Sequence, residues 1–158
     1  MNIFFGVVFI FSIFIDQITK LWAVNVLKDG SSIKIIGDFL MLSYVENRGA
    51  AFGILQNQLW FFVIATIVMM SILLYIFIKF KNITMLSRLS ITLIGGGAIG
   101  NFVDRIKLGY VVDFIDVRFG NIYNFPVFNF ADSFVVVGSF LMVILILFNK
   151  FEKSGLNE

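Results

Sequence analysis

The chain has 158 residues, of which 59% are hydrophobic and only 14% are charged, a composition that excludes an ordinary soluble domain and predicts an integral membrane protein. Its net charge of +2 is small and dispersed, without a basic stripe interleaved with aromatics, which excludes a nucleic-acid-binding surface. The chain contains neither Cys nor His, so any chemistry must use Asp, Glu, Lys, Ser, Tyr or the backbone.

Four stretches are apolar enough, and long enough or nearly so, to cross the membrane, since spanning roughly 30 Å of hydrocarbon takes about 20 helical residues. The first stretch carries Asp16, Gln17 and Lys20 in its second half. It has no basic n-region or small-residue cleavage site, so we expect a retained helix and not a cleaved signal peptide. The predicted helices span residues 4–24, 59–78, 89–105 and 131–148.

The two longer connections differ in pattern. In residues 25–58, apolar positions alternate in a strand-like way over residues 33–45, on both sides of a Gly-Asp turn at 37–38. We expect a small hairpin or sheet there that rests on the membrane surface. The other long connection, residues 106–130, is predicted as a loop.

Basic residues near the helix ends predict the orientation, because Lys and Arg are enriched in cytoplasmic connections. They lie between the second and third helices and after the fourth: Lys79, Lys81, Arg88, Lys150 and Lys153. We therefore expect both termini in the cytoplasm and both long connections outside. Three cations of the first long connection fit this rule less well: Lys28, Lys34 and Arg48. Without an internal repeat or linker, residues 1–158 are expected to form one domain.

The third stretch contains a G-x-G-x-x-G pattern over residues 95–100. In a soluble protein this pattern suggests a dinucleotide-binding loop, but here it has no preceding strand and lies within an apolar helix. Gly96 and Gly100 are about one turn apart, and small residues let membrane helices approach closely. We therefore expect these glycines to serve helix packing.

Asp16 and Lys20 are four residues apart and can share one helix face as an internal ion pair. Ionisable residues at membrane depth cost about 2.5 to 3.5 kcal/mol each on insertion scales, so they also raise a functional hypothesis. Lys20 is an alternative candidate for the base of a Ser-Lys dyad, with Ser43, Ser133 or Ser139 as nucleophile. The spacing selects none of these serines.

Carboxylates gather near the outer ends of the third and fourth helices. Fifteen residues separate Arg88 from Asp104, which corresponds to about 22 Å of helix and is shorter than the hydrocarbon core. Asp132 similarly opens an apolar run of sixteen residues that ends at Phe148. Two short helices would therefore place these carboxylates at the same shallow depth on the outer side.

Neighbouring residues distinguish the carboxylates. Asp104 precedes Arg105 and Lys107, and Asp116 precedes Arg118, so nearby cations favour the ionised form of both. We expect the loop cations Arg48, Lys107 and Arg118 to lie near anionic headgroups.

Asp113 and Asp132 are instead surrounded by apolar residues. Desolvation raises the pKa of a carboxyl group, and two adjacent carboxyls do not both ionise easily, so such a pair can share one proton as acid and base. This is the requirement of an aspartic peptidase. A cap or loop role remains the alternative for each Asp taken singly.

Five segments resemble, in order and spacing, the motifs of the lipoprotein signal peptidase family, also called signal peptidase II. The resemblance covers most of the chain and shows no departure at the motif residues. The matching segments are DQITK at 16–20, NRGAAF at 47–52, GNFVDR at 100–105, VDF at 112–114 and FNFAD at 128–132.

This resemblance implies an aspartic endopeptidase of the bacterial plasma membrane, with four transmembrane helices and a small extracytoplasmic β-cradle. Such an enzyme removes the signal peptide of a prolipoprotein by cutting before a Cys that carries diacylglycerol. The resemblance further implies contact with membrane lipids, inhibition by globomycin-type antibiotics, and no metal or other cofactor.

The resemblance also assigns roles to individual residues. It implies a catalytic dyad of Asp113 and Asp132, in agreement with their apolar surroundings. Four polar residues would line the substrate site: Asn47, Asn101, Arg105 and Asn129. Four others would support the site: Asp16, Lys20, Gly49 and Asp104.

Two functions of other classes are also weighed. In a metal-dependent enzyme acting on lipid phosphates, Mg²⁺ would be held by four carboxylates: Asp104, Asp113, Asp116 and Asp132. A small ion or proton transporter would instead be built around Asp16 and Lys20, although the halves of the chain lack the inverted-repeat symmetry of many transporters.

Overall fold

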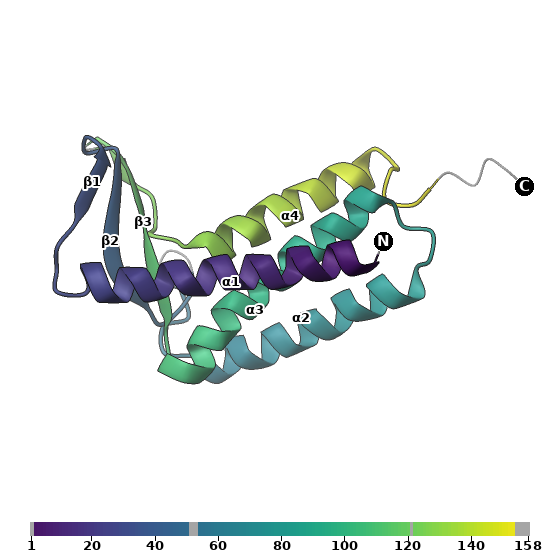
Figure 1. The fold of residues 1–158 in the computed structure, drawn as a ribbon, viewed down its shortest axis with the longest axis horizontal. Coiled ribbons are helices and arrows are strands. Elements are labelled where there is room, and N and C mark those ends of the chain that lie inside the picture. Colours follow the sequence, from purple (N-terminus) through teal and green to yellow (C-terminus); the bar gives the residue numbers. More distant parts are fainter. Residues whose placement is uncertain (1, 51–53, 121, 154–158) are drawn as a thin grey trace, which may run out of the picture.

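The structure is a computed structural model that describes residues 2–50, 54–120 and 122–153. Four helices pack side by side along the long axis of the molecule, and a small sheet lies at one end of them (Figure 1). All four helices are long and apolar enough to cross a membrane, which confirms the four predicted segments. Their bounds are α1 Asn2–Leu27, α2 Leu59–Lys79, α3 Met85–Leu108 and α4 Phe130–Leu147.

Helix α3 is longer than the predicted 89–105. It begins after Thr84, whose side chain accepts a hydrogen bond from the Ser87 N–H (3.2 Å), and it ends at Gly109 in the left-handed conformation. Its 24 residues correspond to roughly 36 Å, so the predicted bounds were too narrow, whereas the depth of Asp104 in the membrane stays a prediction. The apolar run underestimated the helix because polar residues cap and flank both of its ends.

Four antiparallel strands form the sheet in the order β1-β2-β3-β4, with bounds β1 Ile33–Ile36, β2 Leu40–Asn47, β3 Val111–Phe119 and β4 Tyr123–Asn124. The predicted hairpin over residues 33–45 is confirmed, with its turn at Gly37. Strands β3 and β4 lie in the segment 106–130, which was predicted as a loop. Strand β3 was missed because Val111 to Phe114 are all buried, so no alternation marks them.

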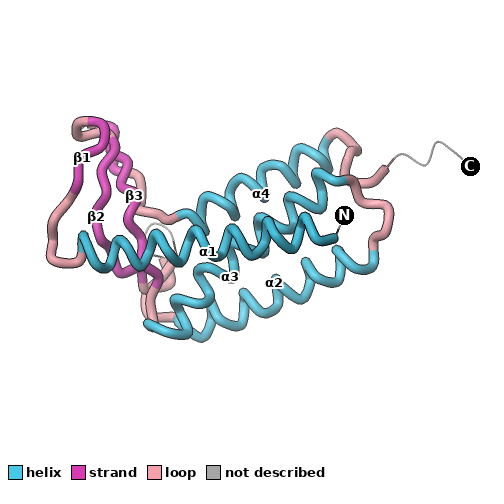
Figure 2. Tube along the Cα trace, in the orientation of Figure 1, coloured by secondary structure: helices cyan, strands magenta, loops and turns pink. Residues whose placement is uncertain are grey.

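The sheet is attached to the helices through a hydrophobic cluster. Ala23 and Leu27, near the end of α1, pack with Val112 and Phe114 of β3. Figure 2 shows the strands gathered at this one end of the molecule. Since β3 crosses the end of the bundle, its first residues lie close to the start of α4 and the last turns of α3, where Asp113 accepts from Asn129 and the Val112 N–H donates to Asp104.

Glycines permit close contact between the helices, as the G-x-G-x-x-G pattern predicted. A Cβ atom on Gly100 would lie 2.6 Å from Asp16 Oδ2, and one on Gly138 would lie 2.9 Å from the Ser90 carbonyl oxygen. The Ser90 hydroxyl donates to the Gly138 carbonyl oxygen (2.8 Å), which joins α3 to α4. These contacts fix the helices that carry the polar residues described below.

The basic segments lie together at the end away from the sheet. The Lys153 N–H donates to the Asn82 carbonyl oxygen (2.8 Å), and the Thr84 N–H donates to the Phe151 carbonyl oxygen (3.1 Å). The α2–α3 connection therefore contacts the segment after α4. This grouping is what a shared cytoplasmic side requires of Lys79, Lys81, Arg88, Lys150 and Lys153.

Candidate active site

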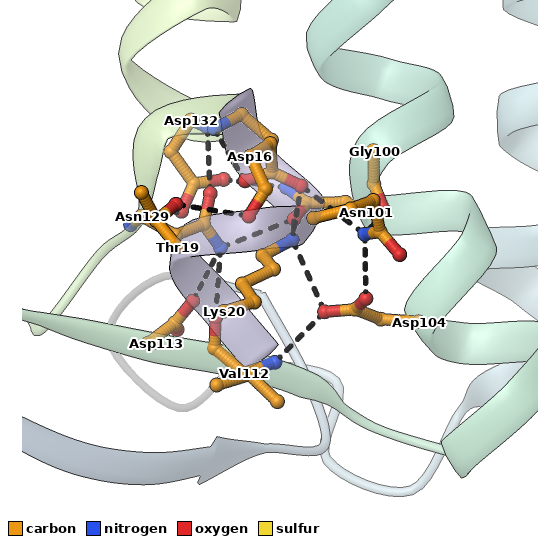
Figure 3. A network of polar contacts seen from close by, with 12 residues as sticks. Asp16, Thr19, Lys20, Gly100, Asn101, Asp104, Val112, Asp113, Asn129 and Asp132 are labelled. Atoms are coloured by element: carbon orange, nitrogen blue, oxygen red, sulfur yellow. Dashed lines mark hydrogen bonds and ion pairs between the residues drawn. The ribbon is translucent and has the colours of Figure 1, made fainter. Parts of the chain in front are cut away.

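Asn129 links the two candidate catalytic carboxylates. It precedes α4, and its side-chain oxygen accepts from the Asp132 N–H (2.9 Å) while its own N–H donates to Asp132 Oδ2 (3.2 Å), which forms a capping box. Its amide Nδ2 donates to Asp113 Oδ1 on β3 (2.6 Å). Figure 3 shows Asn129 among these side chains. A helix start and a strand are thereby fixed relative to each other with both carboxylates at their junction.

Two further amides hold the remaining carboxylate oxygens. Asn47 Nδ2 on β2 donates to Asp113 Oδ2 (2.8 Å), and Asn101 Nδ2 on α3 donates to Asp132 Oδ1 (2.7 Å). Each of the four oxygens therefore accepts a hydrogen bond from an N–H group. Because amides are neutral donors, this arrangement orients the carboxylates without adding a cation.

The environment of Asp113 favours its protonated form. The residue is only 1% exposed, and burial together with the nearby charge of Asp132 raises its pKa to about 7. The hydrogen bonds from Asn47 and Asn129 act in the opposite direction. Asp132 itself is partly exposed, so one member of the pair is enclosed and the other is accessible.

A second polar cluster surrounds Lys20, which is 3% exposed. Its ammonium nitrogen lies 2.8 Å from Asp16 Oδ2 and 3.1 Å from Asp104 Oδ2, and it donates to Asn101 Oδ1 (2.8 Å). The ion pair expected from the Asp16–Lys20 spacing is thus present, and Asp104 adds a second carboxylate from α3. Through Asn101, this cluster is joined directly to Asp132.

The two carboxylates of the Lys20 cluster also bind backbone groups near the candidate dyad. Asp16 Oδ1 accepts from the Ala131 N–H (2.9 Å), next to Asp132. Asp104 Oδ2 accepts from the Val112 N–H (3.1 Å), next to Asp113. The cluster therefore holds the start of α4 and the start of β3 in place, as Figure 3 shows.

Gly49 and Arg105 border the candidate site on another side. The Gly49 N–H donates to Asn47 Oδ1 (2.9 Å), which turns the Asn47 amide toward Asp113. Arg105 Nη2 lies 3.4 Å from the Gly49 carbonyl oxygen, and the guanidinium stacks over the Phe62 ring at 4.6 Å. The end of the NRGAAF motif, residues 51–52, lies outside the described residues.

Comparison with known proteins identifies the family of the chain. A sequence model of the family described as "Signal peptidase (SPase) II" matches residues 8–148. The chain belongs to the signal peptidase II family. This agrees with the resemblance drawn from the five motifs, and it makes the chain an aspartic peptidase of a membrane-protein family.

Relatives of known name are similar over nearly their whole length. A "Lipoprotein signal peptidase" of Clostridium novyi is 44% identical over 140 residues, which are 89% of this chain and 95% of the relative. One from Caldanaerobacter subterraneus is 48% identical over 143 residues, which are 90% of this chain and 94% of the relative.

Solved structures show the same fold. One bacterial membrane enzyme superposes with a TM-score of 0.83 at 36% identity, over 98% of this chain and 92% of the other. A second has a TM-score of 0.81 at 40% identity, over 90% and 92% of the two chains. The chain is therefore a multi-pass membrane protein with four helices and a small antiparallel sheet.

The Ser-Lys alternative finds no geometric support in this signal peptidase II member. The described partners of Lys20 are Asp16, Asp104 and Asn101. Ser43 instead donates to Asp116 (3.0 Å), and Ser133 donates to the carbonyl oxygen of Asn129. The ammonium group of Lys20 is therefore paired with the carboxylates of Asp16 and Asp104.

Asp116 lies apart from the other aspartates. Arg118 hydrogen-bonds both of its oxygens, and these bonds hold the pKa of Asp116 below its usual value. The magnesium alternative would need Asp116 beside Asp104, Asp113 and Asp132. Among the described residues, no group of three or more acidic, His or Cys side chains is placed to hold a metal ion.

Gln17, in the DQITK motif, is a polar residue of the site for which the motifs predict no role. Its amide Nε2 donates to Asp104 Oδ1 (2.9 Å) and to the Gly100 carbonyl oxygen (3.2 Å), so it extends the polar contact between α1 and α3. The available signal was its position between Asp16 and Lys20 in an otherwise apolar helix, where an uncharged amide also needs partners.

Proposed function

We propose that this chain removes signal peptides from prolipoproteins, with Asp113 and Asp132 as its catalytic dyad. Its similarity to proteins named "Lipoprotein signal peptidase" supports the substrate class. The observation that carries the residue assignment is the pair of carboxylates linked through Asn129 and oriented by amides alone.

The proposed chemistry follows from the different environments of the two carboxyls. We assign the proton of the resting dyad to Asp113, whose burial raises its pKa to about 7, and the role of general base to the more accessible Asp132. Asp132 removes a proton from a water molecule, whose oxygen bonds to the scissile carbonyl carbon while Asp113 gives its proton to the carbonyl oxygen. The resulting gem-diol collapses as its C–N bond breaks: one hydroxyl returns its proton to Asp113, which leaves a carboxylic acid, and the leaving amine takes the proton from Asp132.

The neighbouring polar residues have distinct proposed roles. Asn47, Asn101 and Asn129 orient the dyad, and we expect their remaining hydrogen-bonding capacity to face the extended substrate. Arg105 is the better candidate for binding substrate carbonyl groups, because its one hydrogen bond among the described residues is long. Asp16, Lys20, Gly49 and Asp104 support the site from behind.

The placement of the site suits a substrate that is anchored in the bilayer. Asp113 and Asp132 lie at the end of the bundle that carries the sheet, and the basic segments lie at the other end (Figure 1). The positive-inside rule then puts both termini in the cytoplasm and the site, beneath a β-cradle, on the outer side. Cleavage before a diacylglyceryl-modified Cys would leave its lipid tails in the bilayer, and globomycin-type inhibitors are expected to compete there.

Cleavage of a diacylglyceryl-modified prolipoprotein peptide by the purified protein, with excess EDTA, tests this proposal. We expect Asp113→Asn and Asp132→Asn each to lower kcat at least about 10³-fold. Asp116→Asn is the matched control, since it removes a carboxylate from the same strand without touching the dyad. Normal cleavage by either dyad variant, or loss of wild-type cleavage in EDTA, would contradict the mechanism.

A further inference from the structure

An apolar cavity of about 290 Å³ lies between α1, α2 and α3. Its floor includes Phe5, Leu73 and Ile91, which are at most 8% exposed. Its rim includes Gly6 and Leu74, which are exposed on the outer surface of the bundle. In a bilayer that surface faces hydrocarbon, so the cavity is open to a lipid chain and not to water.

The cavity is separate from the candidate active site. It lies near the start of α1, the end of α2 and the start of α3, which Figure 1 shows at the end of the bundle away from the sheet. On α3, the lining residue nearest in sequence to Asn101 is Gly95, six residues or roughly 9 Å along the helix from it, and Thr92 lies further away. The cavity therefore opens nearer to the end of the bundle that carries the basic segments than the dyad does.

A cationic group stands at the end of this cavity. Arg88 lies one turn before Ile91 and Thr92 on α3, and its guanidinium packs over the ring of Phe77, a lining residue, at 4.9 Å. Its Nη2 donates to the Lys81 carbonyl oxygen (3.3 Å), whereas its buried Nε has no hydrogen-bond partner among the described residues. Lys79 and Lys81 are exposed beside it.

We propose that this cavity binds one acyl chain of an anionic phospholipid, with the lipid phosphate held by Arg88. A guanidinium offers paired donors that match a phosphate, and the Nε of Arg88 is a donor still to be satisfied. Lys79 and Lys81 add attraction for a negative headgroup. The apolar lining accommodates the chain, and its volume is close to the lower limit of small-ligand pockets, about 300 Å³.

The charge at the cavity distinguishes this ligand from a signal peptide. A signal peptide also presents an apolar segment to the membrane interior, but its cytoplasmic end carries positive charge. That end would meet three cations, Lys79, Lys81 and Arg88, at this position. An anionic phospholipid has the complementary charge.

Gly6 provides a direct way to fill the cavity. A Cβ atom on Gly6 would meet nothing within 4 Å. The leucine side chain of Gly6→Leu can therefore occupy the cavity without a clash at its Cβ atom. The substitution also replaces a helical glycine with a better helix former. Val7→Leu is its matched control, because Val7 is exposed beside Gly6 and does not line the cavity.

The test measures the Tm of the full chain in neutral detergent during titration with phosphatidylglycerol or phosphatidylcholine. For the wild type we expect a larger rise in Tm with phosphatidylglycerol, because a ligand that binds the folded state stabilises it. Arg88→Gln should weaken the apparent affinity for phosphatidylglycerol about tenfold. Lys150→Gln, which removes an exposed charge from the same end, should behave like the wild type.

Gly6→Leu should retain or exceed the wild-type Tm without lipid and lose most of the response to phosphatidylglycerol, while Val7→Leu keeps that response. Equal weakening by Arg88→Gln and Lys150→Gln would overturn the proposal in favour of diffuse attraction. If phosphatidylglycerol raises the Tm of Gly6→Leu as much as that of the wild type, the proposal that an acyl chain binds in the cavity is overturned. A full Tm rise with soluble glycerol phosphate would do the same, since that probe has no acyl chain.

Discussion

Two clusters of carboxylates lie side by side in this protein, and their neighbours differ. In one, Asp16 and Asp104 contact the ammonium of Lys20. In the other, Asp113 and Asp132 contact only amide and backbone N–H groups among the described residues. Asn101 touches both clusters, since it accepts from Lys20 and donates to Asp132.

This difference separates a structural task from a chemical one. A carboxylate paired with a buried ammonium is fixed in charge and position, and such a pair suits the joining of helices. A carboxylate oriented by neutral amides keeps a proton that it can exchange near neutral pH. The dyad therefore depends on the Lys20 cluster for its position and on its neutral amide donors for its chemistry.

The largest effect should come from Lys20→Met, which leaves Asp16 and Asp104 buried without their cation. Removing one partner of a buried ion pair costs about 3 to 5 kcal/mol, so we expect a large fall in Tm in detergent together with loss of cleavage. Lys150→Met, at an exposed position, should leave the Tm unchanged. A Lys20→Met variant as stable as the wild type would remove the structural role assigned to this cluster.

Asn129→Ser should separate the helix cap from the orientation of the dyad. Ser is a good N-cap, so the start of α4 is retained, but the bond from Asn129 Nδ2 to Asp113 is lost. We expect a Tm close to that of the wild type and a fall in kcat of about 10²-fold. Asn129→Ala should lower the Tm as well, and full activity in Asn129→Ser would contradict the role given to its amide.

Asp113→Asn should stabilise the folded protein in a pH-dependent way. The folded-state pKa of Asp113 is about 7, above its ordinary value of 3.8, so the folded wild type loses stability as the pH rises from about 4 to 7. The neutral amide avoids this loss. We expect the advantage of Asp113→Asn in free energy of unfolding, measured from the shift in Tm, to grow from pH 4 to 7, by about 2 kcal/mol between pH 5 and 7, and then to level off. An advantage that is independent of pH would contradict the raised pKa.

Gly49→Ala should have the smallest effect. A Cβ atom there would lie 2.6 Å from the Ile54 carbonyl oxygen, so the loop must shift and the Asn47 amide turns away from Asp113. We expect a fall in kcat of about fivefold with a stability change of about 1 kcal/mol. Gly6→Ala is the control, since a Cβ atom at Gly6 meets nothing within 4 Å, and equal effects of the two changes would remove this explanation.

The sequence predicted most of the fold because apolar length is a strong signal for membrane helices. All four helices and the first hairpin were found in this way. Strand β3 was missed because it is buried on both faces at Val111 to Phe114 and so resembles an apolar loop. The ends of α3 were missed because capping and basic residues interrupt the apolar run.

The sequence also indicated which carboxylates belong together, but not what joins them. Apolar neighbours distinguished Asp113 and Asp132 from Asp116, and Asp116 does pair with Arg118. The contact of Lys20 with Asp104 was not predicted, because it joins residues 84 positions apart. The same holds for Asn129, whose role as both cap and link depends on where β3 crosses the bundle.

Infrared difference spectroscopy of protein with ¹³C-labelled aspartate carboxyls would test the shared proton most directly. The spectrum of the wild type minus that of Asp113→Asn, followed from pH 4 to 9, isolates the titration of Asp113. We predict a protonated carboxyl signal that disappears with a midpoint near pH 7. A difference spectrum that shows only the ionised carboxylate throughout this range would contradict the assignment of Asp113 as the proton carrier.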